Sequence, residues 1–316
     1  MDVRKPVAVI SVVLMAIAWY FAVQYKNETN VIPASGTSLG QYRVELITMD
    51  KTDEHWDYVN RGASDMARFA GIQYQWEAPQ NKNVEQQIEL INNAVANGVD
   101  LIMIAATDRG AVGTALEEAK AHGVKIIYVD SPANVEALVT LATDNYRAGQ
   151  IAGRSMLEEI QEHGINKGVI GIIGVDKETN STMDREKGFR DIINKDGRFS
   201  LLPTVYMEGE IEASKIAATD FITQNNDLAG IFGTNEGSTT GVGAAIQSSG
   251  KSIIGIGFDR SDAIIEFLNS GDLKAVMVQN PYTMGYLGMA EAIAALKGDS
   301  LGPNFINTGV AILRKR

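Results

Sequence analysis

Short apolar runs alternate with longer amphipathic segments through most of this chain, and this alternation limits the folds open to it. The run at 44–49 precedes a helical pattern at 58–71, and the runs at 100–106 and 168–174 precede further helical patterns. The run at 100–106 is uniformly apolar after Asp100, which is typical of a parallel strand that is buried on both faces. Strands that alternate with helices form βαβ units with right-handed crossovers. The pattern therefore predicts an α/β protein with doubly wound parallel sheets.

The same alternation recurs from residue 44 to residue 298, beyond the usual size of one domain, so two lobes are expected. We expect strands at 44–49, 72–76, 100–106, 124–130, 168–174, 201–207, 228–233, 253–259 and 273–279. We expect helices at 58–71, 84–98, 111–123, 183–194, 213–225, 238–250, 262–271 and 284–298.

Polar residues follow several of these strands. Ligands of open parallel sheets bind beyond the carboxyl ends of the strands, so these residues are candidates for function. They are Asp50 to Trp56, Asp130, Ser131, Thr234, Asn235, Glu236, Asp259, Gln279 and Asn280. Asp and Asn also form turns and cap helices at such places, so the pattern alone allows either role.

An uncharged apolar run at residues 7–23 follows Arg4 and Lys5. Its length is at the short end of a membrane-spanning helix, and the preceding basic residues predict a cytoplasmic N-terminus with the rest of the chain outside. The polar stretch up to residue 40 has the composition of a linker. We therefore expect residues 1–40 to be a membrane anchor plus linker, which makes the protein a single-pass membrane protein with an extracytoplasmic domain.

The alternative is a cleaved signal peptide, after which the protein would be secreted or periplasmic. Ala16 and Ala18 have the spacing that a signal peptidase needs, but cleavage there would leave an apolar end that begins at Trp19. The chain has no cysteine, which excludes disulfides and a lipid anchor on an N-terminal cysteine.

Charge and motifs exclude several functional classes. The net charge of −11 argues against nucleic-acid binding, which needs a basic surface. The three histidines lack metal-ligand spacing, and no cofactor is expected, because the glycines at 170–174 do not form a dinucleotide-binding motif. The chain has no GxSxG elbow, P-loop or cysteine nucleophile. We therefore do not expect an enzyme, and a sugar-processing activity has no catalytic motif to support it.

Six segments, in this order, resemble the type I periplasmic sugar-binding protein family, which includes ribose-, galactose- and xylose-binding proteins. They are NGVDLIMIAATD with GVKIIYVDS, TDNYRAGQIAG, MDREKGF, IFGTNEGSTTG, IIGIGFDRSD and VMVQNPYTMGY. The resemblance covers residues 42–313 and implies two α/β lobes joined by a hinge of three crossings. It places the crossings near Thr143–Asp144, Gln279–Asn280 and 307–309. One lobe would then comprise 41–143 with 280–307, and the other 144–279 with 308–316.

The resemblance also implies that a monosaccharide binds between the lobes. Carboxylate, amide and guanidinium groups suit the hydroxyl edges of a sugar, and an aromatic ring suits its apolar face. The ligand-binding positions that it implies are Asp53, His55, Trp56, Asp130, Ser131, Asn145, Arg185, Asn235, Asp259 and Gln279. Two of them depart from the family: Ser131 stands where several relatives carry Arg, and His55 stands where ribose-type relatives carry a second aromatic residue.

Each position also has a purely structural interpretation. Trp56 could pack in the core, and Arg185 could be a solvated charge on its helix. Asp130, Asp259 and Asn235 could serve only as caps.

Two outputs are open for a sugar-binding protein of this kind. The closed, ligand-bound form could dock on an ABC permease, or it could contact a membrane histidine kinase. A helical anchor without a lipid-attachment cysteine favours the kinase. A lactose-repressor-type regulator shares the two-lobe core, but it would need a basic helix-turn-helix before residue 40, where the apolar segment lies.

Overall fold

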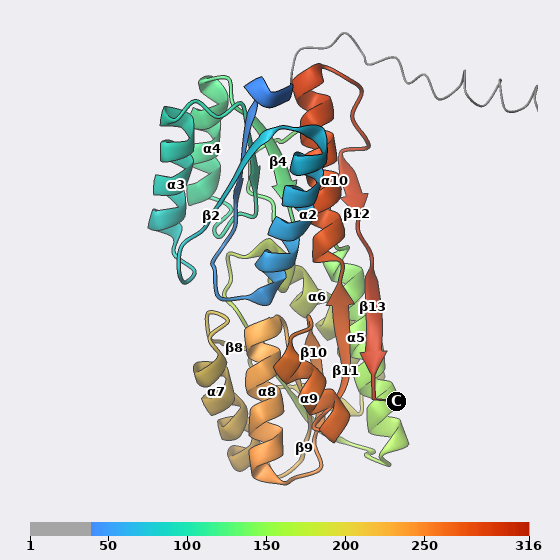
Figure 1. Ribbon diagram of the computed structural model, residues 1–316. Helices are drawn as coiled ribbons and strands as arrows, with labels where there is room; N and C mark the ends of the chain where they lie inside the picture. Colours follow the sequence, from blue (N-terminus) through green and yellow to red (C-terminus); the bar gives the residue numbers. More distant parts are fainter. Residues whose placement is uncertain (1–38, 316) are drawn as a thin grey trace, which may run out of the picture. The chain divides into compact units, whose positions relative to one another are not determined.

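The computed structural model describes residues 39–315, of which those from Gly40 onward belong to one compact unit. The expected anchor at 7–23 lies outside the described residues and stays a prediction. No helix within the described part of the chain is long and apolar enough to cross a membrane. Two parallel-stranded sheets, each flanked by helices, make up this unit (Figure 1). We call the part built on the first sheet lobe 1 and the part built on the second lobe 2.

In lobe 1 the strand order is β12-β5-β4-β3-β1-β2, and all neighbouring strands are parallel. The strands are β1 (Arg43–Ile47), β2 (Gln73–Glu77), β3 (Leu101–Ile104), β4 (Lys125–Val129), β5 (Thr140–Ala142) and β12 (Phe305–Asn307). The helices are α2 (Glu54–Ala70), α3 (Val84–Ala96), α4 (Ala111–Ala121) and α10 (Pro281–Lys297), after a 3-10 turn at Leu39–Gln41. Helices α3 and α4 cover one face of the sheet, and α2 and α10 cover the other (Figure 1). The central strand β3 is fully buried, as its uniformly apolar sequence predicts.

In lobe 2 the order is β13-β11-β10-β9-β6-β7, with the short β8 also paired to β6. The strands are β6 (Gly168–Gly174), β7 (Phe199–Leu201), β8 (Val205–Tyr206), β9 (Leu228–Gly233), β10 (Ile254–Phe258), β11 (Leu273–Gln279) and β13 (Val310–Arg314). The helices are α5 (Asn145–Glu162), α6 (Asn180–Asp196), α7 (Ile211–Gln224), α8 (Glu236–Ser249) and α9 (Asp262–Ser270). All pairs are parallel except β11 with β13, which is antiparallel. The predicted α/β class with doubly wound parallel sheets is confirmed, and β13 is the exception.

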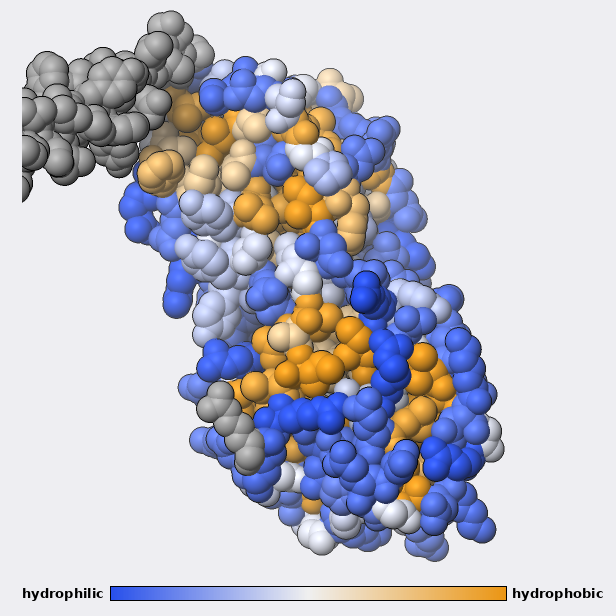
Figure 2. Space-filling view, turned by 90° about the vertical axis from the view of Figure 1, so that its right-hand side faces the viewer, coloured by the Kyte–Doolittle hydropathy of each residue, from blue (hydrophilic) through white to orange (hydrophobic). Residues whose placement is uncertain are grey.

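The chain passes between the two sheets at three places. It leaves the first sheet after β5, returns to it after β11, and leaves it again between β12 and β13. Only Thr308 and Gly309 separate the last two strands, so the third passage is short. The face on which β12 and β13 lie is seen in Figure 2, where apolar side chains gather in patches over the lower part of the molecule.

Three segments differ from their predictions. The strand expected at 201–207 is two short strands, β7 and β8, because Pro203 between them has no N–H to donate to a ladder. The first helix begins at Glu54 rather than at Tyr58, since Asp53 caps it. Helix α5 was not predicted as a helix, because the segment was interpreted only as a crossing between lobes.

Close helix packing in each lobe depends on glycine. In lobe 2, a Cβ on Gly149 of α5 would collide with the carbonyl oxygen of Arg185 in α6, and a Cβ on Gly188 would collide with that of Tyr146. In lobe 1, Gly62 and Gly285 play the same part between α2 and α10. The two α5–α6 glycines therefore set the position of the backbone that carries Arg185.

Candidate ligand-binding cleft

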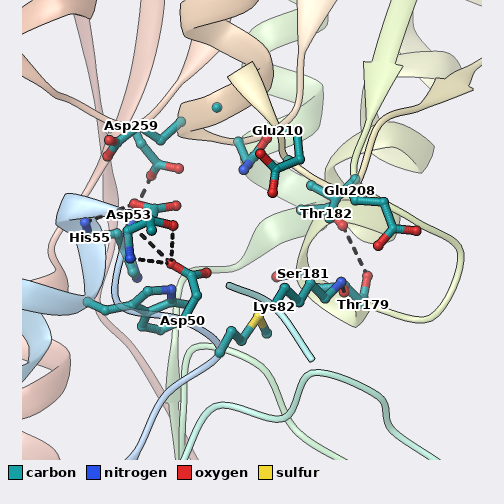
Figure 3. A pocket seen from close by; sticks show the side chains of 18 of the residues that line it. Asp50, Asp53, His55, Lys82, Thr179, Ser181, Thr182, Glu208, Glu210 and Asp259 are labelled. Atoms are coloured by element: carbon teal, nitrogen blue, oxygen red, sulfur yellow. Dashed lines mark hydrogen bonds and ion pairs between the residues drawn. The ribbon is translucent and has the colours of Figure 1, made fainter. Parts of the chain in front are cut away.

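A cavity of ≈ 390 Å³ is lined by strand ends and helix starts from both lobes. Figure 3 shows Asp53, His55 and Asp259 gathered at one end of it, and Glu208, Glu210 and Thr182 at the other. Eight of the ten residues proposed for ligand binding line it: Asp53, His55, Trp56, Asp130, Arg185, Asn235, Asp259 and Gln279. The fold thus brings together side chains that are up to 226 positions apart in the sequence, between Asp53 and Gln279.

The other two residues, Ser131 and Asn145, do not line the cavity but form hydrogen bonds with residues that do. The Ser131 hydroxyl donates to Asp130 Oδ1 at 2.7 Å, and it lies 2.8 Å from the Ser181 hydroxyl of lobe 2. Asn145 Oδ1 accepts a hydrogen bond from Arg185 Nε at 2.8 Å. Ser131 and Asn145 are both buried and do not line the cavity, so their contact with it is indirect.

Asp130 and Asp259 occupy matching places in the two lobes, directly after β4 and β10. Both are buried, and both have a left-handed backbone, with φ of 67° and 70°. Such a backbone is rare outside glycine, and strained residues of this kind concentrate at functional sites. The interpretation as plain helix caps accounts for neither residue. Helix α9, which follows Asp259, is capped by Ser261, and the element that follows Asp130 is the strand β5.

His55 lies between the two carboxylates. Its Nε2 is 3.4 Å from Asp130 Oδ2, and its Nδ1 is 3.9 Å from Asp259 Oδ1. Burial alone would lower the pKa of His55, but Asp130, Asp259 and Asp53 more than offset this and raise its pKa to about 9. Burial likewise opposes ionisation of Asp130, yet His55 and Arg185 lower its pKa to about 2. At neutral pH the histidine is therefore a cation and Asp130 is an anion.

Arg185 is 2 % exposed, so it is not a solvated charge on its helix. Its Nη1 donates to the Thr234 carbonyl oxygen at 3.0 Å and lies 3.8 Å from Asp259 Oδ2. Its guanidinium carbon lies 4.0 Å from the centroid of the Phe258 ring, within the range of a cation–π contact. These contacts fix the guanidinium fork at the wall of the cavity.

Trp56 is 5 % exposed and lines the cavity from helix α2. Its ring meets the His55 ring edge to face, with centroids 4.7 Å apart and planes at 89°. The ring is thus held in one orientation by packing while it forms part of the wall. Trp56 therefore packs in the core and also lines the cavity.

The N-termini of α2 and α8 approach the cavity from opposite lobes. Asp53 caps α2 by accepting a hydrogen bond from the His55 N–H, and Asn235 caps α8 through a capping box with Ser238. The capping interpretation of Asn235 is confirmed, and its position in the cavity wall is compatible with it. The positive ends of both helix dipoles therefore face this region, where they favour negative charge.

Glu236 and Lys82 were not among the residues proposed for ligand binding. Glu236 is the first residue of α8, is 8 % exposed, and its Oε2 has no hydrogen-bond partner in the described structure. Burial and the nearby Asp53 raise the pKa of Glu236 to about 10. Glu236 is one of the polar residues that follow strands in the sequence. Its raised pKa depends on Asp53 of the other lobe, and the sequence alone does not show that these two residues lie close together.

Lys82 follows β2 and reaches across to lobe 2. It forms an ion pair with Asp176 and donates to the Thr179 hydroxyl at 2.8 Å. Burial lowers its pKa to about 8, although Glu208, Asp50 and Asp108 act in the opposite direction. Its place beyond the carboxyl end of a strand is the signal by which the sequence could have identified it.

Among the described residues, no group of three or more His, Cys, Asp or Glu side chains has the geometry to hold a metal ion. The arrangement suits an organic ligand with many polar groups: carboxylates, amides and a guanidinium lie around the wall, with an aromatic ring on one side.

Residues 44–300 match the family model of the periplasmic binding protein domain. Among curated proteins, the chain is 24% identical to the ribose import binding protein of Bacillus subtilis over 269 residues, which are 84% of this chain and 85% of that protein. It is 25% identical to the ribose import binding protein of Escherichia coli over 221 residues, which are 69% of this chain and 73% of that protein.

Solved structures resemble the fold closely. A carbohydrate transporter solute-binding protein from Agrobacterium radiobacter, in complex with D-arabinose, is 31% identical with a TM-score of 0.83, covering 87% of this chain and 94% of that chain. An ABC transporter solute-binding protein from Agrobacterium vitis, bound with α-D-tagatopyranose, is 28% identical with a TM-score of 0.83, covering 87% and 95%. The resemblance found in the sequence is thereby confirmed, and these relatives are binding proteins rather than enzymes.

Proposed function

The chain belongs to the periplasmic binding protein family, and we propose that it binds a monosaccharide in the cavity between its two lobes. The observation that carries this proposal is the composition of the cavity wall. His55, Arg185 and Gln279 supply hydrogen-bond donors, and Asp130 and Asp259 supply acceptors, while Trp56 offers an aromatic surface. The ring hydroxyls of a sugar both donate and accept, so they match such a mixed wall.

The relatives support the same class of ligand. Two of the most similar solved structures hold D-arabinose and α-D-tagatopyranose, and several curated relatives are ribose import binding proteins. The role of each lining residue stays a proposal: Trp56 stacks on a sugar face, and Asp130, Arg185, Asn235, Asp259 and Gln279 bind hydroxyls. Ser131 and Asn145 position Asp130 and Arg185.

We assign lobe 1 to residues 41–143 with 280–307, and lobe 2 to 144–279 with 308–316, so that a ligand would contact both. Sugar binding would then favour the closed arrangement of the lobes over an open one. The closed form would act on a membrane partner, either an ABC permease or a histidine kinase. The similarity to import binding proteins supports the permease, and the apolar run at 7–23 without a lipid-attachment cysteine supports an anchored sensor.

The decisive experiment measures the thermal unfolding of the full-length chain, in mild detergent, against a panel of pentoses and hexoses. A ligand present at 100 times its Kd stabilises the folded state by about 2.7 kcal/mol, so its shift in melting temperature is measurable. If neither the pentoses and hexoses nor their amino derivatives shift the melting temperature, the proposal is wrong.

The Trp56→Phe variant tests whether the sugar that binds contacts Trp56. Loss of the larger ring should weaken sugar binding by about 1 kcal/mol, the scale of an aromatic contact. Trp76→Phe is the matched control, since Trp76 lies in β2 outside the cavity lining. Equal affinities for both variants would remove Trp56 from the site.

A further inference from the structure

The cavity holds more acidic side chains than cations that could match them. Two basic residues, Lys82 and Arg185, and one histidine, His55, line it. The acidic residues in the lining are Asp50, Asp53, Asp130, Glu208, Glu210, Glu212, Glu236 and Asp259.

The three cations are already paired. His55 lies between Asp130 and Asp259, and Arg185 lies 3.8 Å from Asp259. Lys82 pairs with Asp176, which is not in the lining. Within the described part of the chain, Asp53 and Glu236 therefore form no ion pair, although both belong to the cavity wall.

These two carboxyl groups are brought together by opposite lobes. Asp53 is the N-cap of α2, and Glu236 is the first residue of α8. Burial and Asp259 raise the pKa of Asp53 to about 6, although His55 and Glu236 act in the opposite direction, and burial with Asp53 raises the pKa of Glu236 to about 10. A proton is therefore held between them at neutral pH, and the pair keeps about one negative charge.

Glu236 also has an unused acceptor. Its side chain is more than nine-tenths buried, and its Oε2 accepts no hydrogen bond within residues 39–315. A buried acceptor without a partner is unfavourable, so a group on the ligand that donates a hydrogen bond to it would stabilise the complex. Gln279 Oε1, in the same wall, is a second acceptor without a partner.

Within the described chain, the unpaired carboxyl groups and the free acceptor of Glu236 favour a ligand group that has a positive charge and several hydrogen-bond donors. A sugar hydroxyl can donate one hydrogen bond and carries no charge, whereas a protonated amine supplies three donors and a positive charge. A hydrogen bond between an ammonium and a carboxylate is about twice as strong as one between neutral groups. The dipoles of α2 and α8 favour negative charge here, but they supply no donor to Glu236 Oε2.

Resting on the proposed function, we propose that the ligand is an amino sugar, whose protonated amine is bound jointly by Asp53 of lobe 1 and Glu236 of lobe 2. The remaining hydroxyls would face the groups already described, on His55, Arg185 and Asp259. An ammonium between Asp53 and Glu236 would also link the two lobes, so that it stabilises the closed arrangement directly.

The test uses the full-length chain in mild detergent and titration calorimetry. The neutral sugar with the largest thermal shift is compared with its amino-deoxy derivatives, one ring position at a time, and with their N-acetyl forms. One amino derivative should bind about tenfold or more tighter than the neutral parent, a difference of about 1.4 kcal/mol. Its N-acetyl form, which is uncharged, should lose the gain.

Two variants identify the carboxyl groups. Asp53→Asn keeps a good N-cap and Glu236→Gln keeps the shape of the side chain, and each should remove most of the gain from the amino group. Asp57→Asn is the matched control, because Asp57 is an exposed acid in the first turn of α2 outside the cavity lining.

The outcomes separate the two proposals. If neutral sugars bind and no amino derivative binds more tightly, the amino-sugar inference is wrong and the proposed function stands. If neither neutral nor amino sugars bind, the proposed function fails, and the inference fails with it. An amino preference that survives in both variants would overturn the assignment to Asp53 and Glu236.

Discussion

At the scale of single residues, the cleft is lined by titratable groups whose pKa values depend on their neighbours. His55 is held as a cation by Asp130, Asp259 and Asp53, with a pKa of about 9. Glu236 is held neutral by burial and by Asp53, with a pKa of about 10. Perturbed groups of this kind concentrate at functional sites, because such sites are buried and lined with charge.

These shifts predict that the ligand-free protein loses stability as the pH rises. Glu236 has an ordinary pKa of 4.5 and His55 one of 6.5, and both values are raised in the folded protein. A group with a raised pKa contributes stability that is fully present below its unfolded pKa and is lost as the pH rises through its folded pKa. The contribution of both groups to the free energy of unfolding therefore decreases as the pH rises from about 7 to about 9. One proton of difference changes the free energy of unfolding by about 1.4 kcal/mol per pH unit.

Glu236→Gln isolates one of these groups. Glutamine stays neutral at every pH, so the melting temperature of the variant should fall less steeply between pH 7 and pH 9, with the part due to His55 retained. Thermal unfolding at a series of pH values measures both slopes, with Asp57→Asn as control. Identical slopes for Glu236→Gln and the unmodified chain would mean that Glu236 is already ionised in the folded protein.

At the scale of secondary-structure elements, Arg185, one of the residues proposed for ligand binding, is positioned by a backbone contact that lies away from the cleft. Helix α5 approaches α6 at Gly149, where a Cβ would collide with the carbonyl oxygen of Arg185. We expect Gly149→Ala to push the helices apart and to destabilise the protein by about 1–3 kcal/mol, the usual effect of overpacking. Sugar affinity should also fall, because Arg185 moves with its backbone.

Gly110→Ala is the matched control, since the nearest atom to its new Cβ is 3.5 Å away, in the range of ordinary contact. Chemical unfolding measures the stability of both variants, and calorimetry measures their sugar affinity. A Gly149→Ala protein as stable as Gly110→Ala would show that α5 and α6 can separate without strain.

Elements differ in how far the sequence determines them. Strands such as β3 and β10 were predicted correctly, because a run of apolar residues that is buried on both faces has a distinctive sequence. The division of 201–207 into β7 and β8 was not predicted, although Pro203 marks the interruption. Helix α5 was overlooked because its segment was interpreted only as a crossing between lobes, although Ala148, Ala152, Met156 and Ile160 recur at helical spacing.

The sequence predicts some residues of the cleft but not others. Residues that end strands, such as Asp130 and Asp259, can be located from the pattern, because carboxyl ends of parallel strands share one edge. The pairing of Asp53 with Glu236 was not predictable, since it joins two lobes whose approach depends on many contacts. Arg185 was identified only through the resemblance to the family. The sequence of α6 does not indicate that this arginine is buried against α5.

At the scale of the whole molecule, polar contacts link the two lobes around the cavity. Lys82 pairs with Asp176, the Ser131 hydroxyl meets that of Ser181, and Arg109 Nη1 donates to Asn180 Oδ1 at 2.8 Å. Each contact can form only when the lobes are close together. They therefore favour the closed arrangement over an open one, in addition to any effect of the ligand.

Arg109→Ala tests this without altering the cavity lining. Loss of one interlobe hydrogen bond, about 1 kcal/mol, should lower the closed population and weaken sugar binding several-fold. Paired spin labels, one in each lobe, measure the separation of the lobes in solution with and without sugar. Arg198→Ala is the control, because the ion pair of Arg198 with Asp196 lies within lobe 2. Unchanged label distances and affinity in Arg109→Ala would show that the lobes close without help from this contact.

We predict last that residues 7–23 are retained and hold the protein at the membrane. Residues 7–23 carry no charge, and as a helix they would extend about 26 Å, close to the hydrocarbon thickness of about 30 Å. Retention of this run is expected because cleavage after Ala18 would expose Trp19, Tyr20 and Phe21 at a new N-terminus. Fractionation of cells followed by intact-mass measurement should find the protein in the membrane fraction with residues 7–23 present. A soluble chain that begins at Trp19 would instead identify a signal peptide, and the binding unit would then act as a freely diffusing protein, which favours import over an anchored sensor.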